Sequence, residues 1–387
     1  MFRSMPCAKF LSILCLTALC AVRAQAADAA LPDPEKPGLF PVGVTTMMFV
    51  DHSRTDSTTN GPRSLLTDIW YPATDEAKGM PKNHLTDFFL KNKSPEFTLI
   101  MLAAFGVDIG EADKHFENFA VRDATIRDGV YPLLLFSHGN GGFRMQNAFW
   151  CEHMASHGYI VMSPDHTGNC AGTFIDGNLI IFQQSEAARK QSAVDRPKDI
   201  SFLIDAMDRM NKGNDSRFQG RVDMDHIGMS GHSFGGFTCT WVGNLDPRVK
   251  ALAPMAGAAE ERTNFDTPVM ALVADEDRTL GKERSALLAK YADMSKGPHY
   301  QVEFKNGGHY SFTEMYQLRP DFGDGVGAGT RVTNGEPVTY VKKEVAFKMI
   351  NGYTTAFFGK YLRGQNGYDA YLAENHNPDE LITKAAP

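Results

Sequence analysis

A serine flanked by glycines follows a short apolar segment in the middle of this chain. The stretch reads DHIGMSGHSFGGFTC, from Asp225 to Cys239, and contains the pattern G-x-S-x-G with Ser233 at its centre. A serine hydroxyl is a weak nucleophile at neutral pH, so it needs a base within hydrogen-bond distance and an acid that orients the base. The pattern is short enough to recur by chance, and the rest of the chain must supply these partners.

The residues around Ser233 favour a tight turn between a strand and a helix. HIGMSGH is typical of a buried strand, and a helix is expected from Phe234. Such a turn needs small residues at its two ends, which Gly231, Gly235 and Gly236 provide. The turn would raise the hydroxyl above the carboxyl edge of a sheet and place it at a helix N-terminus, where a developing anion is stabilised. Ser233 is therefore the candidate nucleophile.

The candidate base is a histidine downstream of the serine, because an elbow of this kind is followed by the acid and then the histidine. Three histidines follow Ser233. His309 lies in NGGHYSF, a glycine-rich loop after the last predicted strand of the series. His299 opens that strand, at the wrong end, and His376 lies in the polar tail. His309 is the predicted base.

The candidate acid lies after the preceding strand, PVMALVADED. Asp275, Glu276 and Asp277 all qualify by position. Asp277 is furthest into the loop and best placed to reach Nδ1 of His309, so it is the predicted acid. Asp275 remains the alternative.

An oxyanion hole needs two backbone donors. The first is predicted to be the N–H of Phe234, directly after the nucleophile. The second is expected in SHGNGG, the loop after the first central strand, where the N–H of Asn140 is best placed. His138 in this loop and His232 in the elbow are interpreted as structural residues, and His166 either lines the pocket or packs in its loop.

The elements that must position these residues alternate regularly. Short apolar strands such as YPLLLFSHG and YIVMSPDH are separated by helical patterns such as RPKDISFLIDAMDRM. This alternation predicts an α/β fold with a mostly parallel central sheet and helices on both faces. Residues 27–387 are predicted to form one such domain. Residues 75–128 are charged and helix-leaning around one apolar run, Phe97–Gly106, and are predicted to be a helical cap inserted over the site.

The N-terminus predicts export. Residues 1–26 combine Arg3 and Lys9, the apolar run FLSILCLTALCAV and an A-x-A cleavage site at Ala24–Ala26. The run is too short to span a bilayer, which indicates a cleaved signal peptide. We expect a periplasmic or extracellular protein. The net charge of -7 argues against a nucleic-acid partner, because phosphate binding needs a basic face.

The cysteines and the spacing of possible metal ligands indicate no further reactive site. Cys151, Cys170 and Cys239 remain after the signal, which permits one disulfide and one free thiol without indicating the pairing. Cys239 is expected to be a buried, inert residue. No CxxC, HExxH or EF-hand spacing occurs, so neither a metal nor a cofactor is expected.

Five segments, in order, carry a resemblance to a known family: LTDIWYPA, LLLFSHGNGGFR, RPKDISFLIDAM, IGMSGHSFGG and GGHYSF. The chain resembles the α/β-hydrolase superfamily, and more closely the platelet-activating-factor acetylhydrolase and dienelactone-hydrolase-like esterases. The resemblance covers most of residues 40–315 and implies this fold.

The chain departs from these relatives in two respects. Dienelactone hydrolase carries cysteine as its nucleophile, where this chain has Ser233. The acetylhydrolases place their acid after the strand that matches VKALAPMAGA, where this chain has Ala258 and Ala259 before Glu260. The acid is therefore expected one strand later, as in cutinase-like polyester hydrolases.

The pattern as a whole predicts a secreted serine esterase that needs no cofactor. Its substrate is expected to be a small-molecule, lipid or polymeric ester, and the apolar run of the insertion allows contact with a membrane surface. The alternatives are an amidase or peptidase, an acyltransferase, and a non-catalytic binding protein on this fold. The acyl chain length and the oligomeric state are left open.

Overall fold

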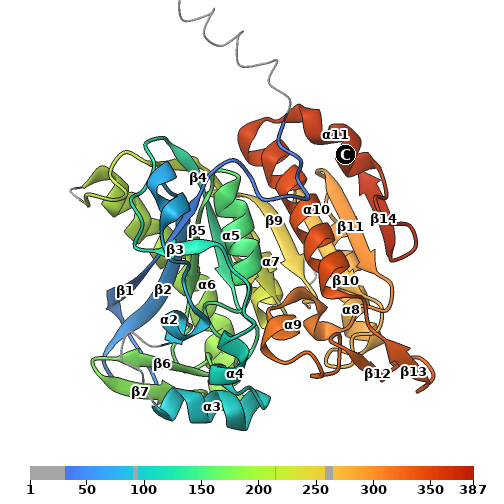
Figure 1. The fold of residues 1–387 in the computed structure, drawn as a ribbon, viewed down its shortest axis with the longest axis horizontal. Helices are drawn as coiled ribbons and strands as arrows, with labels where there is room; N and C mark the ends of the chain where they lie inside the picture. Colours follow the sequence, from blue (N-terminus) through green and yellow to red (C-terminus); the bar gives the residue numbers. More distant parts are fainter. Residues whose placement is uncertain (1–30, 90–94, 214, 258–264) are drawn as a thin grey trace, which may run out of the picture. The chain divides into compact units, whose positions relative to one another are not determined.

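A ten-stranded mixed sheet runs through the computed structural model of the protein (Figure 1). The structure describes residues 31–89, 95–213, 215–257 and 265–387, so the predicted signal at 1–26 lies outside the described residues. The strand order is β14-β11-β10-β9-β8-β4-β5-β2-β1-β3. The central strands are parallel and comprise β4 (Tyr131–Ser137), β5 (Ile160–Pro164), β8 (Val222–His232), β9 (Val249–Met255), β10 (Val269–Ala274) and β11 (His299–Phe304).

The strands at the two edges of the sheet add antiparallel pairs. β2 pairs antiparallel with both β5 and β1, and β14 pairs antiparallel with β11, whereas β3 is parallel to β1. Their bounds are β1 (Val42–Thr55), β2 (Pro62–Pro72), β3 (Ala120–Arg122) and β14 (Leu381–Ala386). The sequence did not predict β14, because an exposed edge strand with lysine and threonine carries a weak apolar pattern.

Helices cover both faces of the sheet. α5 (Ala148–Ser156) and α10 (Lys343–Arg363) contact each other and share one face. The opposite face carries α6 (Glu186–Lys212), α7 (Phe234–Leu245) and α8 (Lys282–Asp293) (Figure 1). The prediction of a mostly parallel sheet with helices on both faces is thereby confirmed.

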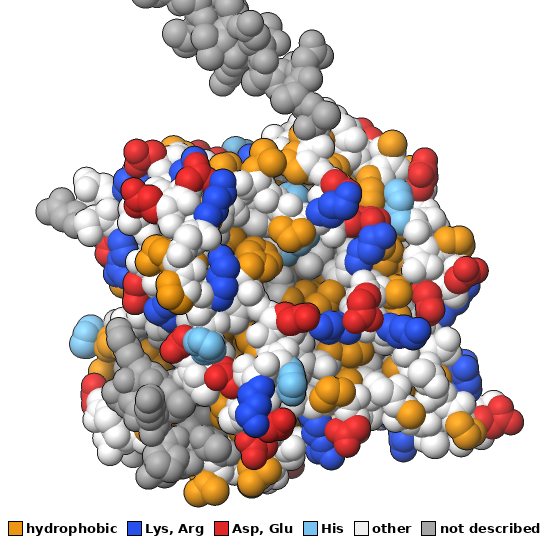
Figure 2. Space-filling model, viewed as in Figure 1, with side chains coloured by type: hydrophobic (Ala, Val, Ile, Leu, Met, Phe, Trp, Pro, Cys, Tyr) orange, Lys and Arg blue, Asp and Glu red, His pale blue; other side chains and the backbone are white. Residues whose placement is uncertain are grey.

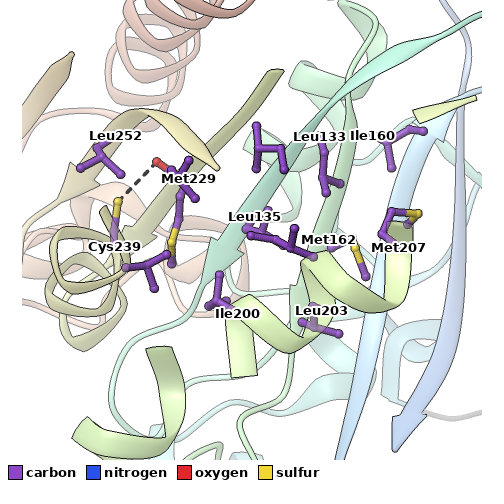
Figure 3. Packing of buried hydrophobic residues seen from close by; sticks show 14 of the residues in the cluster. Leu133, Leu135, Ile160, Met162, Ile200, Leu203, Met207, Met229, Cys239 and Leu252 are labelled. Carbon is purple, nitrogen blue, oxygen red and sulfur yellow. Dashed lines mark hydrogen bonds between the residues drawn. The ribbon is translucent and has the colours of Figure 1, made fainter. Parts of the chain in front are cut away.

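The central strands are buried on both sides, which explains their continuous apolar sequences. Every residue of β4 is buried. Leu133 and Leu135 belong to the core beneath α6 and α7, together with Ile200, Leu203 and Met229 (Figure 3). On the other face, Phe136 packs against Trp150 of α5, with ring centroids 5.5 Å apart. This two-sided packing keeps the carboxyl ends of the strands, where the candidate residues lie, in fixed positions.

Helix α6 begins earlier than the sequence pattern predicts. The helical pattern RPKDISFLIDAMDRM begins at Arg196. The helix instead begins at Glu186, capped by Ser185, whose side chain accepts a hydrogen bond from Ala188 N–H at 3.1 Å. These extra turns are largely exposed, so they lack the apolar spacing by which a helix is recognised.

The predicted insertion at 75–128 contains short elements rather than a separate sheet. They are η1 (Asp75–Gly79), α2 (Leu85–Phe89), α3 (Pro95–Phe105), α4 (Ile109–Asp113) and strand β3. α4 contacts α9 (Met315–Leu318), and Leu99 and Leu102 of α3 are exposed. Its role as a cap stays a prediction, as does contact with a membrane surface.

The remaining short elements lie mostly in the loops near the carboxyl edge and at the C-terminus. They are β6 (Gly172–Ile175), β7 (Asn178–Ile181), η2 (His309–Phe312), β12 (Ala328–Thr330), β13 (Pro337–Thr339), η3 (Asn366–Tyr368) and α11 (Asp369–Ala373). Acidic and basic side chains are interspersed over the face drawn in Figure 2. Among the helices that the structure describes, none has the length and apolarity needed to cross a bilayer.

The three described cysteines are buried and free. Cys151, Cys170 and Cys239 form no disulfide, so the bond that their number permitted is absent from the described part of the chain. Cys239 lies in the core between α7 and the sheet, with Sγ 3.3 Å from Met229 O (Figure 3).

Candidate active site

Ser233 occupies a strained turn between β8 and α7. Its φ of 58° and ψ of -119° are unfavourable for a residue with a side chain. A Cβ atom on Gly235 would overlap the carbonyl oxygen of Ser137, and one on Gly231 would overlap that of Gly235. Glycine is therefore required at both positions. The strain at a single serine between two obligatory glycines is the geometry expected of a nucleophile elbow.

The structure brings the three predicted catalytic side chains into one hydrogen-bonded chain. His309 Nε2 lies 2.9 Å from Ser233 Oγ, and His309 Nδ1 lies 2.7 Å from Asp277 Oδ2. Asp277 and His309 are 2% exposed each, while Ser233 is more accessible. Asp277 Oδ1 accepts a second hydrogen bond, from Leu280 N–H at 2.7 Å, which holds the carboxylate toward the histidine.

The three neighbouring carboxylates have different surroundings. Asp277 reaches His309, whereas Glu276 accepts hydrogen bonds from Arg331 Nη1 at 2.9 Å and from Val332 N–H at 2.6 Å. Asp275 Oδ1 is buried without a hydrogen-bond partner among the described residues. Burial, and then the charge of Glu276, raise the pKa of Asp275 to about 6. Of the two candidates, Asp277 alone contacts the histidine.

The backbone donors predicted for the oxyanion hole are both available. Phe234 is the first residue of α7, so its N–H has no acceptor within the helix. In the loop after β4, Gly139 N–H donates to Gln146 Oε1 at 3.0 Å and Gly141 N–H donates to Asn169 O at 2.9 Å. Asn140 N–H has no such acceptor in the described part of the chain, and Asn140 is exposed.

The histidine loop is held by a carboxylate that the sequence did not single out. Asp324 Oδ1 accepts hydrogen bonds from His309 N–H at 3.1 Å and from Arg278 N–H at 2.9 Å, and its Oδ2 accepts one from Thr279 Oγ1 at 2.7 Å. Asp324 therefore ties the acid loop to the base loop. It lies in the glycine-rich stretch 321–335. A side chain that acts by bridging two distant loops leaves no local signal.

Two hollows of very different size meet at Ser233. The smaller has a volume of about 30 Å³ and is lined by Ser233, His309 and several apolar side chains, among them Phe105, Phe143, Met315 and Leu318. Phe105 is the last residue of α3, so the apolar run of the insertion does reach the site. The larger has a volume of about 640 Å³ and lies between α6 and α8. Asn140 and Ser233 line both hollows.

A second Ser–His–Asp chain lies beneath the first. Ser137 Oγ is 2.9 Å from His166 Nε2, and His166 Nδ1 is 2.9 Å from Asp199 Oδ2. All three residues are 0% exposed. The distances alone resemble those of a catalytic triad, so the choice between the two chains depends on access and charge.

The buried chain is poorly suited to catalysis. Burial, and then the charge of Arg196, lower the pKa of His166 to about 3, so the imidazole resists accepting a proton. Asp199 is neutralised by Arg63, whose Nε and Nη2 lie 3.0 and 2.6 Å from its two oxygens. Ser137 is the last residue of β4 and is inaccessible to solvent. His166 is thus a packed residue rather than part of the pocket lining.

This buried network supports the loop that carries Asn140. Arg196 is fully buried and donates to the His138 carbonyl, to Ser137 Oγ at 2.7 Å and to Asn169 Oδ1 at 2.9 Å. Asn169 Nδ2 in turn donates to Asn140 Oδ1 at 2.9 Å. The guanidinium also lies over the ring of Phe234, 4.8 Å from its centroid. Arg196 therefore contacts both segments that carry the predicted oxyanion donors.

His138 and His232 each make hydrogen bonds to a neighbouring loop. His138 Nε2 accepts a hydrogen bond from His166 N–H at 3.1 Å, which joins two loops. His232 Nε2 contacts the carbonyl of His309 at 2.8 Å, and its Nδ1 contacts Gln146 Nε2 at 2.9 Å. Burial lowers the pKa of both histidines, so each stays neutral and keeps its hydrogen bonds to the neighbouring segments.

Two buried glutamates have raised pKa values, and one of them, Glu314, lines the small hollow. Glu152 is 0% exposed; its Oε2 accepts from Phe119 N–H at 2.8 Å, while its Oε1 has no partner among the described residues. Burial raises the pKa of Glu152 to about 8, the Phe119 hydrogen bond lowers it in part, and the charge of Glu314 raises it further. Burial also raises the pKa of Glu314 to about 7.

Because Glu152 is protonated in the folded protein, we expect the free energy of unfolding to fall as pH rises. Between its ordinary pKa of 4.5 and its folded pKa of about 8, the folded protein holds a proton that the unfolded chain releases. The free energy of unfolding should therefore fall by up to about 1.4 kcal/mol per pH unit across this window. Glu152→Gln cannot ionise and should flatten the slope in guanidinium unfolding measured across the window.

The matched control for this effect is Glu283→Gln, which alters an exposed glutamate of α8. It should leave the pH slope as it is in the wild type. An unchanged slope in Glu152→Gln would mean that Glu152 is ionised in the folded protein at neutral pH.

Comparison with known proteins shows what this chain is similar to. The family described as "Platelet-activating factor acetylhydrolase, isoform II" matches residues 28–194, and the family described as "PET hydrolase-like" matches residues 136–318. A solved ferulic acid esterase from Streptomyces cinnamoneus superposes with a TM-score of 0.70 at 23% identity, covering 93% of this chain and 100% of that one. The resemblance and the α/β-hydrolase fold inferred from the sequence are confirmed.

The curated relatives are distant. The platelet-activating factor acetylhydrolase of Cavia porcellus is 23% identical over 286 residues, which cover 65% of this chain and 62% of the relative. That of Bos taurus is 25% identical over 252 residues, which cover 56% of this chain and 53% of the relative. The chain thus matches less than two thirds of the length of these relatives.

Proposed function

We propose that this chain is a member of the α/β-hydrolase superfamily and a serine esterase that cleaves carboxylic esters through an acyl-enzyme. The observation that carries the proposal is the Ser233–His309–Asp277 chain, which opens onto two hollows from a strained elbow. The names of the similar proteins, an acetylhydrolase, a PET hydrolase-like family and a ferulic acid esterase, all denote ester hydrolysis.

The proposed reaction has two halves. His309 Nε2 takes the proton of Ser233 Oγ as the oxygen attacks the ester carbonyl carbon, and the N–H groups of Phe234 and Asn140 stabilise the oxyanion. The C–O bond to the alcohol breaks while His309 returns the proton to the leaving oxygen. Water then attacks the acyl-enzyme with the same proton transfers and releases the acid. Asp277 keeps His309 oriented and stabilises its charged form.

We further propose that the small hollow binds the acyl group. A volume of about 30 Å³ has room for roughly one or two heavy atoms beyond the carbonyl. Its apolar lining suits a methyl or ethyl group. An amidase, a peptidase or an acyltransferase would use the same side chains, so the leaving group and the acceptor have to be tested directly.

A p-nitrophenyl ester series tests both proposals. Acetate should be hydrolysed with a kcat/KM at least about tenfold above that of octanoate, because the longer chain does not fit the small hollow. A preference for octanoate would place the acyl chain in the larger hollow instead. Matched anilides should react far more slowly than the esters, and adding an alcohol should not divert the acyl group.

Labelling decides between the two serines. A fluorophosphonate reacts only with an activated, accessible serine, and peptide mass spectrometry should find it on Ser233. Modification of Ser137 would overturn the assignment. Export of the protein is also proposed, from the signal pattern in residues 1–26, and is checked by the N-terminus of the mature protein after expression with its own leader.

A further inference from the structure

The larger hollow beside Ser233 differs from the small one in composition as well as in size. It lies between the first turns of α6 and the first turns of α8, with residues of α7 between them. Its lining comprises Asn140, Glu186, Arg189, Lys190, Ala193, Ser233, Phe234, Phe237, Thr279, Leu280, Arg284 and Leu287. One half of an ester whose carbonyl lies at Ser233 would extend into this hollow.

The larger hollow is called the groove below. The positive and negative charges of its lining side chains do not cancel. Arg189 and Lys190 lie on α6, and Arg284 faces them from α8. Among the described residues of the lining, the only acid is Glu186, which pairs with Lys190 at 2.8 Å. Neither Arg189 nor Arg284 forms an ion pair with any described residue, and both are exposed. Two uncompensated guanidinium groups therefore border the groove of a chain with a net charge of -7.

The rest of the groove is apolar. The rings of Phe234 and Phe237 stack at 5.8 Å with an interplanar angle of 25°, and Leu280 and Leu287 are partly exposed beside them. Stacked rings and leucines favour a flat or aliphatic body, whereas arginine binds carboxylate and phosphate oxygens in pairs.

We propose that this groove selects esters whose alcohol half joins an apolar or aromatic body to an anionic group. Arg189 and Arg284 bind the anion, and Phe234 and Phe237 bind the body. The inference rests on the proposed function, because the acyl group must occupy the small hollow for the alcohol half to enter the groove. The anion is a carboxylate or a phosphate, both of which match the guanidinium.

A matched pair of aryl acetates measures the selection. 4-Acetoxybenzoate carries the anion, and its methyl ester is neutral; each kcat/KM is divided by the rate of alkaline hydrolysis to remove differences in leaving-group reactivity. Wild type should favour the anionic ester about three- to tenfold, since exposed charges interact modestly, and added salt should reduce the ratio. 4-Acetoxyphenyl phosphate shows whether phosphate is preferred to carboxylate.

The variant that tests the groove is Arg189→Gln with Arg284→Gln. Its ratio should fall to about one, as the guanidinium groups are lost. Arg209→Gln is the control, because Arg209 is an exposed arginine further along α6 that does not line the groove; its ratio should equal that of the wild type. Thermal unfolding confirms that the variants fold. A ratio near one in the wild type, or an equal preference in the double variant, overturns the proposal.

Binding without turnover separates this proposal from the esterase proposal. The Ser233→Ala protein is titrated with 4-acetamidobenzoate and with neutral 4-acetamidobenzamide. Tighter binding of the anion that disappears with the two arginine changes supports the groove even if no ester is hydrolysed. Equal binding of the two compounds, alongside Ser233-dependent hydrolysis of neutral esters, rejects the groove and leaves the esterase proposal intact.

Discussion

Replacing Ser233 by alanine is expected to lower kcat for p-nitrophenyl acetate by at least about 10⁴-fold, because the acyl-enzyme can no longer form. Ser233 Oγ lies 2.9 Å from His309 Nε2 and borders both hollows, so the change removes the hydroxyl that contacts this base. The alanine side chain fits the same turn, and the strained backbone angle should persist. Thermal unfolding should therefore show a folded protein with little activity.

Ser137→Ala is the matched control for this experiment. Ser137 takes part in the buried chain with His166 and accepts a hydrogen bond from Arg196. Its loss should lower stability by about 1–3 kcal/mol, since buried partners lose a hydrogen bond. Activity should fall much less than in Ser233→Ala, through looser support of the loop that carries Asn140. Equal losses in the two variants would show that the buried chain is itself needed for the chemistry.

Asp277→Asn is expected to reduce kcat by about 10³- to 10⁴-fold with little change in KM. An asparagine amide presents an N–H or a weaker acceptor to His309 Nδ1, which favours the wrong tautomer and removes the charge that stabilises the imidazolium. Asp277 Oδ2 lies 2.7 Å from that nitrogen, so the effect is direct. Initial rates across a range of pH would separate this loss from a shift in the ionisation of the base.

Asp275→Asn provides the comparison, since the same chemical change is made two residues away. Asp275 contacts no part of the catalytic chain, and burial raises its pKa to about 6. Activity should stay within about threefold of wild type, as expected for a residue outside the reacting groups. A larger loss in Asp275→Asn than in Asp277→Asn would identify Asp275 as the acid and require the loop to rearrange in solution.

The candidate side chains could be chosen from the sequence because each follows a strand whose apolar pattern is strong. Ser233, Asp277 and His309 lie after three different strands of a parallel sheet, and the carboxyl ends of such strands meet at one edge. The order of nucleophile, acid and base along the chain then limits the choice. This logic depends only on local composition and on the connectivity of parallel sheets.

The supporting residues could not be chosen in this way. Asp324 joins the acid loop to the histidine loop, and Arg196 joins three loops beneath the site, but neither lies in a pattern that marks its function. The buried Ser137–His166–Asp199 chain also shows that residue types alone do not identify a catalytic site. Its residue types and distances match a triad, but its burial, the low pKa of its histidine and the pairing of Asp199 with Arg63 argue against catalysis.

The sequence by itself determined the α/β class, the elbow and the candidate triad, because apolar periodicity and glycine placement are local properties of the chain. The tertiary structure decided which carboxylate contacts His309, which of two Ser–His–Asp chains opens to solvent, and how charge and volume are divided between the two hollows. These features depend on side chains brought together from α3, α6, α7 and α8, and such distances and exposures are set by packing across the whole domain.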